Sequence, residues 1–158
     1  MAALDVAGAI ANTKSMLSNL AAWQTICGVS TAALAAARIY EGGTDEEEDL
    51  SLTPCIFLDV TSLPTNWLAN HLRGTLAIEI RVELDVPEDQ RTTYSTQYVW
   101  VWGKFGELMA GINGAVGGSG QLMIQGLSTP TMPGRIDPNT NSGRCEWGFI
   151  YSLTVDFR

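Results

Sequence analysis

The sequence predicts an α+β protein with a four-stranded, mainly antiparallel sheet and helices packed on one face. Apolar and polar residues alternate along residues 75–86 and again along residues 145–158, which is typical of strands with one buried face. Residues 94–112 instead place apolar side chains at steps of three and four, which is typical of an amphipathic helix. Strands and a long helix are therefore expected to share one core.

The N-terminal part, residues 1–43, is predicted to be helical. Apolar residues recur on one helical face along residues 4–23. Ser30 can cap a second, alanine-rich helix that runs through Tyr40, and Gly42 and the glycine after it are expected to stop it. We expect this part to precede the sheet within a single domain of 158 residues.

The sheet is expected in residues 51–158, with the long helix between its second and third strands. A glycine-rich segment follows that helix, and a proline-containing loop at 128–143 leads into the last strand. The four predicted strands are residues 53–60, 75–86, 121–128 and 145–158.

The composition excludes several classes of protein. The net charge is −8 and the pI is about 4.4, so tight binding to nucleic acid is not expected, because Lys and Arg supply most of that affinity. The three cysteines have no metal-ligand spacing, and buried free thiols are the simplest interpretation. No signal peptide and no apolar run of membrane-spanning length are visible, which predicts synthesis and assembly in the cytoplasm.

The acidic loop before the first strand contains six carboxylates in ten residues, EGGTDEEEDL. Asp45, Glu47 and Asp49 have the spacing of the first three ligands of a calcium-binding hand. However, Leu50 stands at the position where such a loop requires glycine, and Ile56 stands where it requires a bidentate glutamate. No metal site is therefore predicted. The loop is instead expected to be a solvated, negatively charged segment.

No motif predicts catalysis or cofactor binding. The only histidine, His71, has no nucleophile motif around it, and the GGSG at 117–120 lacks the remainder of a phosphate loop. Glu79, Arg81 and Glu83 alternate on the polar side of a predicted strand, and a solvated sheet face explains them. We therefore predict a non-enzymatic protein with no catalytic, cofactor or metal residues.

Residues of an interaction surface are more promising candidates for a functional site than catalytic residues are. Five tryptophans are many for this length, and interfaces are enriched in tryptophan. Trp102 falls beside the apolar stripe of the long helix and is the one predicted to be exposed. The possible interface residues are Glu46, Glu47, Glu48 and Trp102.

The order of elements resembles that of the tail terminator, or tail completion, proteins of long-tailed bacteriophages, and of minor tail proteins encoded beside them. The resemblance lies in an N-terminal helix, a short strand after a proline, the alternating strand TLAIEIRVELDV, a helix with a glycine-rich end, and the last strand CEWGFIYSLTVDFR. It covers nearly the whole chain, although the alanine-rich second helix is additional to the simplest version of this pattern.

The resemblance implies a structural protein of the virion, assembled in the host bacterial cytoplasm. Such proteins form a ring, expected to be a hexamer, that caps the tail tube and joins it to the head-side neck proteins, while DNA passes through without specific binding. Two alternatives remain open. The first alternative is another phage neck or tail tube component, and the second is a small-molecule-binding α+β domain.

Overall fold

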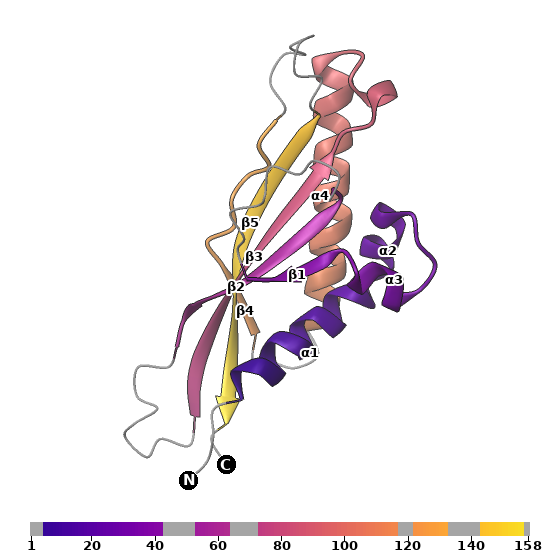
Figure 1. The fold of residues 1–158 in the computed structure, drawn as a ribbon. Helices are drawn as coiled ribbons and strands as arrows, with labels where there is room; N and C mark the ends of the chain where they lie inside the picture. Colours follow the sequence, from indigo (N-terminus) through magenta and orange to yellow (C-terminus); the bar gives the residue numbers. More distant parts are fainter. Residues whose placement is uncertain (1–4, 43–52, 64–72, 117–121, 133–142, 157–158) are drawn as a thin grey trace.

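The computed structural model describes residues 5–42, 53–63, 73–116, 122–132 and 143–156 (Figure 1). Glu46, Glu47 and Glu48 of the acidic loop, His71, and the GGSG segment lie outside the described residues.

Five strands form one mixed sheet in the order β1-β2-β3-β5-β4. The four predicted strands are confirmed, and each lies antiparallel to its neighbours among them. The fifth strand, β1, was not predicted and pairs in parallel with β2. The strands are β1 (Ile39–Glu41), β2 (Cys55–Ser62), β3 (Arg73–Asp85), β4 (Leu122–Gln125) and β5 (Arg144–Asp156).

The centre of the sheet is the pairing of β3 with β5, which runs over all 13 residues of each strand. The two ends of this ladder are the pairs Arg73–Asp156 and Asp85–Arg144. Since neither strand contains a proline, both can exchange a full set of ladder hydrogen bonds. β3 and β5 are the longest strands in Figure 1.

The prediction of one continuous helix over residues 4–23 is wrong. The chain forms α1 (Val6–Ser18) and then α2 (Ala21–Cys27). Leu20 between them is extended, with φ −69° and ψ 123°, and its side chain is buried. The break turns α2, so that the side chain of Trp23 is fully buried. Burial of two large side chains outweighs the small propensity gain from an unbroken helix.

The second predicted helix is also shorter than expected. It is α3 (Ala32–Ala36), and Thr31 rather than Ser30 caps it by accepting a hydrogen bond from the Leu34 N–H at 3.3 Å. The chain then enters β1, where Ile39 is 1% exposed and pairs with Ile56. A buried cross-strand contact of two β-branched residues here overrides the helix propensity of the preceding alanines.

The long helix is confirmed as α4 (Tyr94–Val116), which extends four residues beyond its predicted end. Thr93 starts it by accepting the Thr96 N–H at 3.1 Å. A short 3₁₀ helix, η2 (Glu88–Gln90), connects β3 to this point.

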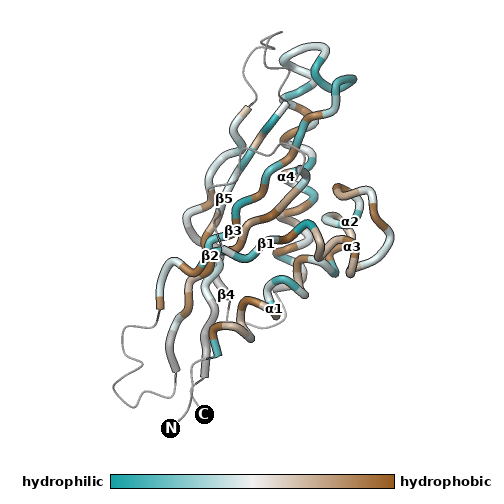
Figure 2. Tube along the Cα trace, viewed as in Figure 1, coloured by the Kyte–Doolittle hydropathy of each residue, from teal (hydrophilic) through white to brown (hydrophobic). Residues whose placement is uncertain are grey.

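One hydrophobic core joins the sheet to all four helices. Phe105 of α4 packs edge-to-face on Trp147 of β5, with ring centroids 5.5 Å apart, so α4 lies against the apolar face of the sheet. Figure 2 shows the alternation of hydrophobic and hydrophilic residues along the strands that produces this face. The largest core side chains in the sheet are Ile39, Ile56, Leu58, Leu76, Ile78, Ile80, Leu84, Trp147 and Phe149.

Candidate interaction surface

Five positions in line on the exposed side of α4 carry no charged side chain, and the ion pair of Lys104 with the exposed Glu107 lies beside them. These positions follow steps of four, three, four and three, so they lie in line on the helix. A solvent-exposed helix face normally carries charged or polar residues. The five residues are Val99, Gly103, Gly106, Ala110 and Asn113, all exposed. We call them the α4 outer face.

The glycines of this face are not required by packing within the described part of the chain. A Cβ atom added at Gly103 or Gly106 would meet no atom within 4 Å. Glycine within an exposed helix costs about 0.5–1 kcal/mol relative to alanine. Glycine also allows another backbone to approach closely. The α4 outer face therefore leaves room for another backbone to approach closely.

An aromatic row runs along the flank of α4 from the surface to the core. The rings of Tyr94, Tyr98, Trp102, Phe105 and Trp147 follow one another at centroid distances of 6.1, 6.1, 5.2 and 5.5 Å. Exposure falls along the row from 62% at Tyr94 and 46% at Tyr98 to 2% at Trp147. The row anchors an exposed aromatic end rigidly to the core.

The exposure predicted for Trp102 holds only in part. Its side chain is half-buried between Tyr98 and Phe105, and its indole nitrogen is fully buried without a hydrogen-bond partner among the described residues. The more exposed apolar residues nearby are Tyr94, Tyr98 and Val99, the last of which is 67% exposed. The spacing was visible in the sequence: Tyr94 and Tyr98 precede Val101 at steps of four and three and so continue the apolar stripe, whereas Val99 lies on the opposite side of the helix.

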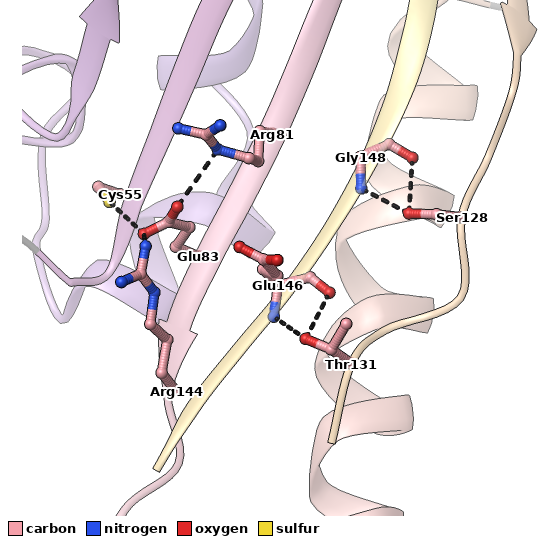
Figure 3. Close-up of polar contacts among 8 residues, drawn as sticks. All are labelled: Cys55, Arg81, Glu83, Ser128, Thr131, Arg144, Glu146 and Gly148. Atoms are coloured by element: carbon pink, nitrogen blue, oxygen red, sulfur yellow. Dashed lines mark hydrogen bonds and ion pairs between the residues drawn. The ribbon is translucent and has the colours of Figure 1, made fainter. Parts of the chain in front are cut away.

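The opposite face of the sheet is not uniformly solvated, which corrects the prediction for Glu79, Arg81 and Glu83. Glu79 is exposed as expected, but the side chain of Glu83 is only 3% exposed. One oxygen of Glu83 lies 2.6 Å from Nη2 of Arg144, and the other lies 3.2 Å from Nε of Arg81 (Figure 3). The buried carboxylate is therefore held by a guanidinium from its own strand and one from β5.

The surroundings of Glu83 indicate a structural role. The hydrogen bond to Glu83 raises the pKa of Arg144 above its ordinary value. Burial, and then the charge of Glu83, raise the pKa of the neighbouring Cys55 thiol to about 12. Arg81 also lies over the Phe57 ring, 4.8 Å from its centroid. These contacts fix both guanidinium groups against the sheet and tie β2, β3 and β5 together.

A second polar arrangement covers the edge of β5. The Ser128 N–H donates to the Gly148 carbonyl at 2.9 Å. The Gly148 N–H donates to the Ser128 hydroxyl at 2.8 Å, and that hydroxyl donates to the Gly148 carbonyl at 3.2 Å (Figure 3). Thr131 repeats the arrangement at Glu146, with distances of 2.8 and 3.0 Å. Pro130 lies between these two residues and has no N–H to donate, but Ser128 and Thr131 supply the backbone donors on either side of it, so the coverage is not interrupted. Residues 126–132, which we call the edge strap, thus protect an otherwise open strand edge.

A groove of about 370 Å³ lies between the edge strap and the outer face of the sheet. It is open to solvent and lined by charged and hydroxyl side chains, among them Glu79, Arg81, Ser128 and Glu146. The lining residues are mixed in charge and offer no activated nucleophile, because the cysteines lie elsewhere. Its volume is at the lower end of the range of small-molecule sites.

The remaining chemistry-bearing residues are dispersed within the described parts of the chain. No three His, Cys, Asp or Glu side chains in those ranges lie close enough together to hold a metal ion. Cys55 and Cys145 are buried and Cys27 is half-buried, each as a free thiol. Neither α4 nor any other described helix combines the length and apolar character needed to cross a membrane.

Comparisons with known proteins do not assign the chain to a family. No protein-family model matches it, and no match was found among curated proteins.

Proposed function

We propose that this protein is a structural assembly protein, and specifically a tail terminator of a long-tailed bacteriophage. It would form a ring, expected to be hexameric, that caps the tail tube and joins the tail to the head-side neck proteins. The single observation that supports an assembly role best is the α4 outer face, which is uncharged, exposed and rich in glycine. The narrower assignment to a tail terminator rests on the resemblance in element order.

A ring requires two different surfaces on each copy, because its contacts are head to tail. The α4 outer face is a suitable first surface, since small residues let a neighbouring backbone approach and bury apolar area. The aromatic row beside it supplies a rigid flank. The net charge of −8 suits a conduit for DNA, because an acidic wall does not retain phosphates.

The test is the assembly of a variant with a bulky residue on this face, Gly106→Leu. Open space surrounds a Cβ at this position, so folding should be preserved. We expect the wild-type protein to form rings, alone or on purified tail tubes, and the variant to assemble at least about tenfold less well. Light scattering and negative-stain images would measure this.

The matched control is Ala11→Leu, which adds a similar side chain to an exposed position of α1. It should assemble like the wild type. Rings formed equally well by Gly106→Leu would remove the α4 outer face from the assembly. A wild-type protein that stays monomeric and ignores tail tubes would refute the tail terminator assignment itself.

A further inference from the structure

We infer that the end of the molecule formed by η2 and the first turns of α4 is a docking surface for a basic segment of a partner protein. We call it the tyrosine end, and it comprises Glu88, Asp89, Tyr94 and Tyr98. The inference rests on the proposed assembly function in taking the partner to be another structural protein of the particle.

The two tyrosines of the tyrosine end are exposed. Tyr94 is 62% exposed and Tyr98 is 46% exposed. Tyr94 and Tyr98 lie one helical turn apart, with ring centroids 6.1 Å apart. Tyrosine is enriched at interfaces because it offers a wide contact area for few rotatable bonds.

These tyrosines are held in place before any partner binds. Tyr98 contacts Trp102, and the aromatic row continues through Phe105 to the buried Trp147. Because the row is anchored in the core, the exposed rings lose little freedom on binding. Preorganisation of this kind increases affinity without additional contacts.

The charge beside the rings determines the chemistry of the partner. Residues 85–93, which lead into α4, contain three carboxylates and one guanidinium, a local net charge of −2. All three carboxylates, Asp85, Glu88 and Asp89, are exposed, whereas Arg91 is half-buried. η2 contacts α4, and this turn lies at the upper end of the molecule in Figure 1.

Exposed tyrosine rings and exposed carboxylates on two contacting elements, α4 and η2, favour lysine and arginine side chains. A cation over an aromatic face gains about 0.5–1 kcal/mol at exposed sites, and the carboxylates attract the same cation. A second copy of this chain is a poor occupant, because a chain of net charge −8 presents few cations. A basic, partly apolar segment of a different protein fits both features.

The test uses a defined probe, a labelled 16-residue helical peptide of leucine and arginine, with fluorescence anisotropy as the readout. A matched peptide with glutamate in place of arginine is the first control. The aromatic variant is Tyr94→Ser/Tyr98→Ser, and the charge variant is Glu88→Gln/Asp89→Asn. A control variant, Glu47→Gln/Glu48→Gln, removes two charges from the acidic loop instead.

We expect the arginine peptide to bind and the glutamate peptide not to bind. Both tyrosine-end variants should weaken binding by at least about tenfold, and the acidic-loop control by less than about twofold. Equal weakening by the acidic-loop control would mean attraction by net charge alone and would overturn the inference. Retention of binding by the aromatic variant would overturn it equally.

Self-association is measured on the same samples by light scattering. If the tyrosine-end variants abolish ring formation while peptide binding persists, the occupant is a second copy and the inference is wrong. If the wild type binds the peptide through this end but forms no ring, the tail terminator proposal fails and the docking surface stands.

Discussion

The ion pair between Glu83 and Arg144 should be a major stabilising contact of the sheet, although it lies on the face opposite to the one that α4 contacts. Replacing Arg144 with Gln leaves a carboxylate that is 3% exposed with only Arg81 beside it. Removal of one partner of a buried ion pair costs about 3–5 kcal/mol. Because the Arg144 side chain is itself 28% exposed, we expect a smaller loss of unfolding free energy, about 2–3 kcal/mol.

The reverse change, Glu83→Gln, should cost less, about 1–2 kcal/mol, because it leaves two partly exposed guanidinium groups that water can solvate. The double variant should lose less than the sum of the single variants, with a coupling energy of about 1–2 kcal/mol. Urea unfolding followed by tryptophan fluorescence would measure all four proteins.

A matched control is the exposed pair Lys104–Glu107, whose nitrogen and oxygen are 2.9 Å apart. The variant Lys104→Gln should change stability by less than about 0.5 kcal/mol. If Arg144→Gln lowers the unfolding free energy as little as this control does, burial does not make the Glu83–Arg144 pair stabilising. It is also refuted if the effects of Glu83→Gln and Arg144→Gln simply add.

Three further outcomes follow from the described contacts. Burial raises the pKa of Cys55 and Cys145 to about 12, above the ordinary value of 9.0, so the folded state retains these protons and unfolding free energy should fall as pH rises from about 9 towards 12. Urea titrations at several pH values should show a shallower fall in a variant with alanine at both cysteines, and an equally steep fall would contradict the assignment. Thr131→Val should lower stability by about 1 kcal/mol, since it removes the acceptor of the Glu146 N–H, and a neutral effect in thermal unfolding would mean that water replaces the hydroxyl. Gly106→Ala should raise the stability of the isolated chain by about 0.5–1 kcal/mol, and a loss of stability would show that the site is not open.

Periodicity predicted most of the fold correctly. The alternation along residues 75–86 and 145–158 predicted two strands where β3 and β5 lie, with ends that differ by one or two residues, and the steps of three and four identified α4 from its first residue. These patterns are reliable because each strand or helix must present one continuous apolar face to the core. The errors fell where local propensity and tertiary pairing disagree. Alanines predicted a helix through Tyr40, but Ile39 is buried in β1 beside Ile56.

The candidate sites were less predictable than the fold. Glu83 follows the same alternation as Glu79 and was assigned to a solvated face, yet it is buried because Arg144 reaches it from the adjacent strand β5 at the same end of the β3–β5 ladder, 61 residues away in sequence. The two hydroxyls of the edge strap gave no signal either, since their role depends on which strand edge they meet. The acidic residues Glu46, Glu47 and Glu48 lie outside the described residues, so their predicted role remains a prediction.

The sequence by itself determined the α+β class, the four main strands, the long helix and the acidic character, because these depend on spacing and composition within short stretches. Only the tertiary structure decided which polar residues are buried, that a fifth strand joins the sheet, and that the uncharged side of α4 is exposed. The physical reason is that burial and pairing depend on contacts between segments far apart in the chain, which no local pattern encodes.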